Sequence, residues 1–344
     1  SAGIVDHETG TRGLRRLARV LGLTPRIGTL PLVDPAAKAE LPKGDPAIVA
    51  ELKKVATCPR EDGYRKSDCD AEKAWNEYAE KFVEEDDLAK KKAKAVAESC
   101  SSLLEDKEDN IRESAWECIG EYGEAIEAKP LIVRILKDLE KETSAGVRQG
   151  MTFALQRLDP TKAGMTNEVI ALAKKLESNK DASSEFSSLL GALIPGEPKV
   201  EPAKEAIAYA VELTKGDKAK SRAIDILRRA RAGSSADACA ALAAIVETKK
   251  YPWSVAMGAM HAVEGHCKDK MDVVVKVATE KAGEGEGHDK GLRGSDIVYL
   301  EWLARAGVFT DEHKKSLKTA LAQVEKTAKD SDKDLIKKLN EALK

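Results

Sequence analysis

The chain has 344 residues, of which 34% are charged and only 4% aromatic, and its 57 basic and 59 acidic side chains nearly cancel. This composition favours helices, because Ala and unbranched side chains lose the least conformational entropy there. It lacks the β-branched alternation of strands, the long apolar runs of membrane spans and the basic excess of nucleic-acid-binding proteins. We therefore predict an all-α fold with no transmembrane segment and no nucleic-acid partner.

Residues 1–70 are predicted to form an N-terminal arm. Residues 11–21 carry four arginines beside leucines and a valine, which predicts a short basic helix. This helix could contact an anionic membrane surface, dock on a partner, or cap the apolar face of the helices that follow. Four prolines then interrupt the chain between positions 25 and 42, and a short helix is predicted at 46–57.

Six cysteines fall along the chain as three pairs of near neighbours, namely Cys58 with Cys69, Cys100 with Cys118, and Cys239 with Cys267. The first pair brackets a turn-rich loop, and each of the others brackets a predicted helical hairpin. Antiparallel helices would bring the second pair to heights roughly 4–5 Å apart. Two interpretations fit: three sequential disulfides in an exported protein, or six small buried side chains in a reduced cytosolic one. We favour disulfides and expect an extracytoplasmic bacterial protein, which is periplasmic, on the cell surface or secreted.

A repeat begins after residue 70. Arg112 and Arg148 are 36 residues apart, and Arg222 and Arg293 follow after 74 and 71 more, which are one, two and two periods. The arginines stand at the start of helices predicted to begin near residues 111, 147, 184, 220, 253, 293 and 333. Between these helices lies a second set of amphipathic segments, such as 132–139 and 317–324, with apolar residues at three- and four-residue spacing.

Two helices per period of about 36 residues, the second beginning with an apolar residue and Arg, resemble the HEAT-repeat family. The resemblance covers residues 71–344. It implies a right-handed α-α superhelix, or solenoid, of about seven antiparallel helical hairpins. It also implies that the repeated arginines join neighbouring repeats, and that the second helix of each hairpin lines a concave surface.

A concave row of helices suits recognition of a protein or peptide, so we predict a non-enzymatic protein-binding scaffold. The candidate partner-binding residues are Trp116, Arg228, Arg229, Trp253, Tyr299 and Trp302. The alternative for the aromatic residues is packing between repeats. The alternative for the arginines is a solvated helix end.

The sequence shows no catalytic constellation and calls for no cofactor. His261, Glu264 and His266 are weak metal candidates beside Cys267. A zinc site needs three or four converging ligands, whereas His266 would point away from the face that His261 and Glu264 share. A HEAT-like enzyme, or a cofactor- or metal-handling protein with an unrecognised site, remains the alternative function.

Overall fold

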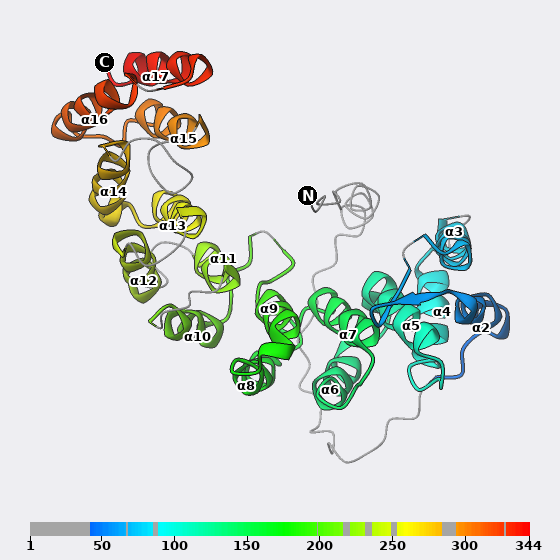
Figure 1. The fold of residues 1–344 in the computed structure, drawn as a ribbon. Helices are drawn as coiled ribbons and strands as arrows, with labels where there is room; N and C mark the ends of the chain where they lie inside the picture. The colour runs from blue at the N-terminus through cyan, green and yellow to red at the C-terminus, as the bar shows by residue number, and fades with distance from the viewer. Residues whose placement is uncertain are drawn as a thin grey trace. The chain divides into compact units, whose positions relative to one another are not determined.

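A computed structural model describes most of the chain beyond the predicted arm. The described residues are 42–66, 68–84, 89–197, 199–215, 221–230, 236–248, 253–283, 294–326 and 328–344. The predicted basic helix at 11–21, with its proposed membrane contact, lies outside them. The chain divides into two compact units, Ser1–Glu40 and Leu41–Lys344, and every element below belongs to the second unit. The described part is almost entirely helical, which confirms the predicted all-α class (Figure 1).

The unit opens with elements that precede the predicted repeat. In chain order these are α2 (Pro46–Lys53), the short 3₁₀ helix η2 (Lys54–Thr57), strands β1 (Arg60–Glu61) and β2 (Tyr64–Arg65), α3 (Asp70–Glu84) and α4 (Ala89–Ser101). The predicted helix at 46–57 is thus present, with Asp45 accepting from the Ala47 N–H as its N-cap. Because α2 packs on α3, α4 and α5, this segment is joined to the helices that follow.

Helices are present at all seven starts predicted from the repeat. They are α5 (Asp109–Tyr122), α7 (Ala145–Arg157), α9 (Ser183–Ala192), α11 (Ser221–Arg229), α13 (Trp253–His266), α15 (Gly294–Arg305) and α17 (Asp330–Ala342). Each begins within three residues of its predicted start. The intervening set comprises α6 (Ala128–Asp138), α8 (Thr166–Leu176), α10 (Lys204–Thr214), α12 (Ala236–Glu247), α14 (Met271–Gly283) and α16 (Asp311–Val324). Short 3₁₀ turns η3 (Gly123–Ala125), η4 (Lys180–Ala182) and η5 (Lys268–Lys270) lie in the connections.

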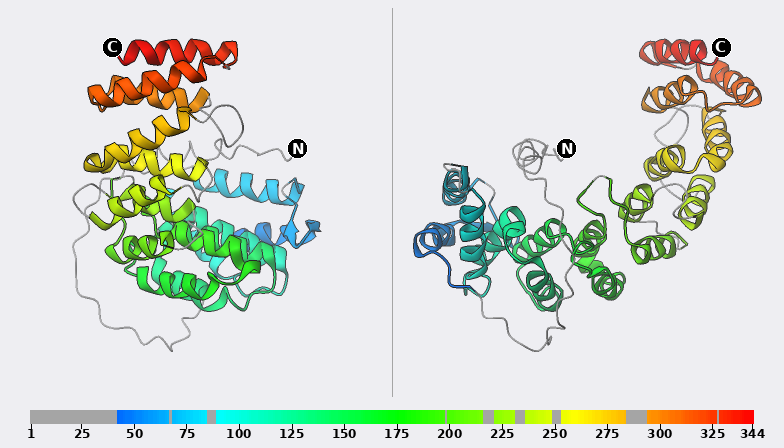
Figure 2. Two further views of the ribbon diagram at one scale, coloured as in Figure 1. Left: turned by 60° about the vertical axis from the view of Figure 1, so that its left-hand side comes forward. Right: turned by 180° about the vertical axis from the view of Figure 1, so that it is seen from behind.

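Helices of the same set pack on one another along the chain. In the odd-numbered set α5 contacts α7, α7 contacts α9, α9 contacts α11, α11 contacts α13, and α15 contacts α17. In the even-numbered set the contacts run without interruption from α6 to α16. Hairpin partners also touch, as α8 does α9 and α12 does α13. Figure 2 shows this run of packed helices from two further sides.

The apolar faces of both sets form one continuous core. It includes Trp116 and Ile119 of α5, Leu155 of α7 and Leu189 of α9. Helices α5 and α7 approach closely at Gly150, where a Cβ would lie 3.0 Å from the Glu113 carbonyl oxygen. Glycine therefore lets the two helix backbones approach here. Within the described residues, we find no helix that is long and apolar enough to cross a membrane.

Three disulfides staple the unit, and they are the pairs predicted from the sequence. Cys58 bonds to Cys69, Cys100 to Cys118, and Cys239 to Cys267. The second joins α4 to α5, and the third joins α12 to the residue after α13. All six thiols are therefore used, because the described residues contain no free cysteine.

Candidate functional site

A β-hairpin between Cys58 and Cys69 is held to the helices by buried polar contacts. Its turn is Asp62-Gly63, with φ of 51° and 83°, the positive values that a two-residue type I′ hairpin turn requires. The sequence analysis expected only a turn-rich loop here. The hairpin lies against α7, where the Gly146 N–H donates to the Gly63 carbonyl at 3.1 Å. The disulfide closes the base of the hairpin and so limits its movement.

Arg65 anchors the hairpin in the core. Its side chain is only 2% exposed and donates to Ser114 Oγ at 2.5 Å, Glu72 Oε1 at 2.8 Å and Glu117 Oε2 at 2.5 Å. Burial by itself lowers the pKa of Arg65, but the hydrogen bonds and charges of Glu72 and Glu117 outweigh burial and raise the pKa above its ordinary value. Arg65 therefore remains charged and holds β2 to α3 and α5.

Arg60 makes the second anchor, on β1 directly across from Arg65. Its guanidinium donates to Asn110 Oδ1 at 2.6 Å and to Ser144 Oγ at 3.1 Å, and it pairs with Glu113 Oε2 at 2.9 Å. Asn110 in turn donates to the Cys58 carbonyl at 2.7 Å. Together the two arginines fix the hairpin to α5 and to the N-terminus of α7.

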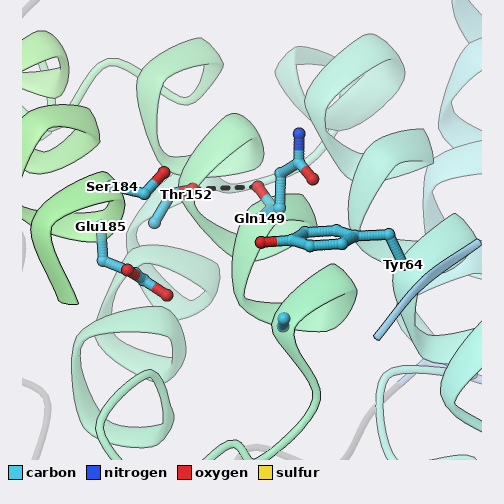
Figure 3. A pocket seen from close by; sticks show the side chains of 6 residues that line it. Tyr64, Gln149, Thr152, Ser184 and Glu185 are labelled. Atoms are coloured by element: carbon cyan, nitrogen blue, oxygen red, sulfur yellow. Dashed lines mark hydrogen bonds between the residues drawn. The ribbon is translucent and has the colours of Figure 1, made fainter. Parts of the chain in front are cut away.

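A polar pocket of about 280 Å³ opens where the hairpin, α7 and α9 meet. Its lining residues are Tyr64, Ala145, Gln149, Thr152, Ser184 and Glu185 (Figure 3). Glu185 is largely buried and accepts from Arg148 Nε at 2.6 Å, while the Thr152 hydroxyl donates to the Gln149 carbonyl at 2.9 Å. Tyr64, Gln149 and Ser184 remain exposed, so a ligand can reach them. None of these pocket residues was a candidate from the sequence.

Two of the three described repeated arginines, Arg112 and Arg148, join neighbouring hairpins as predicted. Arg112 donates to the carbonyls of residues 106 and 107 and pairs with Glu142, 30 residues ahead. Arg148 donates to the carbonyls of residues 142 and 143 and pairs with Glu185, 37 residues ahead. Each therefore ties its own loop to the next hairpin. Arg222 pairs with Asp225 in its own helix, and Arg293 lies outside the described residues.

The predicted aromatic contacts divide into buried and exposed side chains. Trp116 and Tyr299 are 2% and 5% exposed, so both fill the core, as the packing alternative holds. Trp302 is 49% exposed and stacks on Tyr299 with ring centroids 6.3 Å apart. Trp253 begins α13, but its side chain lies outside the described residues. Of the three described aromatic candidates, Trp302 is the one exposed enough for a partner to contact.

The two predicted partner-binding arginines, Arg228 and Arg229, have different surroundings. Arg229 donates to the carbonyls of Pro195 and Glu197, which follow α9, at 3.0 and 3.2 Å. It therefore joins successive hairpins. The Arg228 side chain is half exposed, lies 3.9 Å from Asp225 and contributes positive charge near His261.

The described side chains of the weak metal candidates, His261 and Glu264, belong to no group that could hold a metal ion. The His261 ring packs on the Tyr299 ring with centroids 4.1 Å apart, and Cys267 is held in a disulfide. Partial desolvation of the imidazole, together with the charge of Arg228, lowers the pKa of His261. The side chain of His266 lies outside the described residues, and among those described no three His, Cys, Asp or Glu side chains are grouped to hold a metal ion.

Comparison with known proteins gives no family for the chain. No protein-family model matches the sequence, and no curated protein matches it significantly. We therefore infer function from the contacts, burial and charge of the residues themselves.

Proposed function

We propose that the chain is a non-enzymatic, protein-binding scaffold, in which the odd-numbered helices α5 to α17 line the concave face of a right-handed HEAT-like solenoid of about seven hairpins. Contacts between successive helices of the same set support this architecture. The ties from Arg112 and Arg148 into the next hairpin support it as well. A row of equivalent helices presents side chains from several repeats to a partner at once.

The observation that carries the proposal is the exposed apolar surface of α15. Val298 and Trp302 lie one helical turn apart, and each is 49% exposed. Tryptophan concentrates binding energy at protein interfaces, because a partner removes its large ring from water. Stacking on the buried Tyr299 ring holds Trp302 in place, so binding would cost little additional side-chain entropy.

The three disulfides support an extracytoplasmic site of action. Disulfides persist in oxidising compartments and are rare in the reducing cytosol. Partners are accordingly proteins or peptides of the cell envelope or the extracellular space.

The test compares two exposed apolar side chains, one from each set of helices. The full chain, its Trp302→Ala variant and its Val133→Ala variant are immobilised, and the envelope and secreted proteins that they retain are quantified by mass spectrometry. Val133 is a matched control because it is 40% exposed on α6. We expect at least one protein to be depleted about tenfold by Trp302→Ala and retained by Val133→Ala.

Two results would contradict the proposal. One is a set of retained proteins that Trp302→Ala does not change. The other is a stoichiometric metal or chromophore in the purified protein, measured by elemental analysis and an absorbance scan, which would favour the cofactor-handling alternative.

A further inference from the structure

The pocket between the hairpin, α7 and α9 has no net charge to offer a ligand. Of its six lining residues, Glu185 alone carries an ionised side chain, and that carboxylate is paired with Arg148 at 2.6 Å. None of the six is a lysine or an arginine. Phosphate, sulfate or carboxylate ligands therefore lack a cationic partner, and a cationic ligand meets a carboxylate that is already neutralised.

The exposed groups of the pocket are neutral side chains that form hydrogen bonds. The Tyr64 hydroxyl, the Gln149 carboxamide and the Ser184 hydroxyl each can donate and accept hydrogen bonds. They come from three elements, β2, α7 and α9, and so surround the space from different sides. Figure 3 shows Tyr64 extending from the hairpin with its hydroxyl end toward the side where Ser184 and Glu185 lie.

The hairpin presents the Tyr64 ring as a rigid platform. The Tyr64 residue is 42% exposed, while its neighbour Arg65 is held by Ser114, Glu72 and Glu117. The disulfide at the base of the hairpin adds a covalent constraint. A preordered aromatic surface beside neutral hydrogen-bonding groups loses little entropy when a ligand binds.

We propose that this pocket binds a neutral saccharide. A pyranose ring has an apolar C–H face that can pack on Tyr64, and its hydroxyls donate and accept at once, as do the Tyr64, Gln149 and Ser184 side chains. A pocket of about 280 Å³ accommodates one or two sugar units of a longer chain.

A peptide main chain fits the same groups less well. Extended peptides are usually bound by pairing with an exposed strand edge. Ala145, Ser184 and Glu185 lie in the first turns of α7 and α9, where main-chain N–H groups have no acceptor within their own helix, so these elements offer single donors instead of the alternating N–H and C=O groups of a strand edge. Recognition therefore depends on side chains and single donors, which favours a ligand that carries hydroxyls around its perimeter.

The inference is independent of the protein-binding proposal, because Trp302 lies on α15 and none of the pocket residues does. The test titrates the full chain with neutral hexoses, N-acetylhexosamines and their β-linked oligosaccharides, using calorimetry and ligand-observed NMR. We expect at least one of these sugars to bind. We also expect Tyr64→Ala and Gln149→Ala to weaken its binding about tenfold or more.

Matched variants separate binding from folding. Tyr64→Phe keeps the ring and loses only the hydroxyl, so it should weaken binding less than Tyr64→Ala. Val133→Ala and Trp302→Ala lie outside the pocket and should leave sugar binding unchanged. Because Tyr64 and Gln149 are exposed, their variants should retain the circular dichroism and melting temperature of the wild type.

Three results would overturn the assignment. The first is that no sugar of the panel binds. The second is that a sugar binds equally well to wild type, Tyr64→Ala and Gln149→Ala. The third is that Tyr64→Ala abolishes retention of a protein while sugars have no effect on that retention, which would assign the pocket to a protein side chain.

Discussion

Replacing Arg65 with methionine removes the buried charge that holds the hairpin while keeping much of the side-chain length. Arg65 donates to Ser114, Glu72 and Glu117, and its own side chain is 2% exposed. Removing one partner of a buried ion pair costs about 3–5 kcal/mol when the other charge stays buried. Here Glu72 and Glu117 keep 18% and 41% of their side-chain surface exposed, so water can partly replace the guanidinium. We therefore expect a loss of about 3 kcal/mol, the lower end of that range.

The matched control is Arg222→Met. The Arg222 side chain is 48% exposed and pairs with Asp225 of its own helix at 3.5 Å. An exposed pair of this kind contributes little, so the variant should lose less than about 0.5 kcal/mol.

Urea unfolding followed by circular dichroism measures both losses, and amide hydrogen exchange of the hairpin gives a local readout. Exchange at Tyr64 and at its neighbours should accelerate in Arg65→Met alone. The reasoning is refuted if the two variants lose equal stability, or if hairpin exchange is unchanged in Arg65→Met.

Three further outcomes are expected. A thiol assay on denatured protein should find no free thiol before reduction and six after it. Replacing both Cys100 and Cys118 with Ala should lower the free energy of unfolding by about 3 kcal/mol, because their disulfide spans 18 residues. A double variant as stable as the wild type would contradict this. Burial and neighbouring carboxylates raise the pKa of Tyr122 to about 12, so the neutral phenol favours the folded state at neutral pH, and that contribution should fall as the pH rises from about 10 through 12. In tyrosinate absorbance the Tyr122→Phe variant should lose one ionisation step near pH 12, and an unchanged titration curve would count against this reasoning. Gly150→Ala should lower the melting temperature, because a Cβ there lies 3.0 Å from a main-chain oxygen of α5. The control Gly265→Ala has no described atom beyond its own helix backbone within 4 Å of its Cβ, so it should leave the melting temperature unchanged or raise it. Equal melting temperatures for the two variants would contradict the close approach of α5 and α7.

The helices could be predicted from the sequence because apolar periodicity recurs along the chain and, at some starts, a capping signal agrees with it. Thr310 illustrates this, since it caps α16 through the His313 N–H at 3.2 Å and completes a reciprocal capping box with the His313 side chain. Apolar residues at three- and four-residue spacing then specify the buried face. The sequence separation of the cysteines likewise predicted the disulfide pairs, because each pair brackets a single turn of the chain.

The hairpin was missed because each strand is two residues long, too short for an alternating pattern to appear. A usable signal was nevertheless present in Asp62-Gly63, the dipeptide that two-residue hairpin turns prefer. The pocket had no such signal. Tyr64, Gln149 and Ser184 are separated by 85 and 35 residues of chain, and the packing of both β2 and α9 on α7 brings them together.

Exposure of the aromatic residues could not be predicted either. Trp116 and Trp302 both lie on odd-numbered helices, yet the first is 2% and the second 49% exposed. Periodicity places a side chain on one face of its helix, but the next hairpin decides how much of that face is covered.

The order of the disulfides along the chain bears on how the protein acquires them. Six cysteines allow 15 pairings, and the observed one joins each odd cysteine to the next in sequence. A chain that crosses a membrane from its N-terminus into an oxidising space presents Cys69 when Cys58 is the only other thiol of this sequence available. The same holds for each later pair once its predecessor has closed. For a chain exported in this way, oxidation during emergence would reach the native pairing directly, without mispaired intermediates that an isomerase must reshuffle.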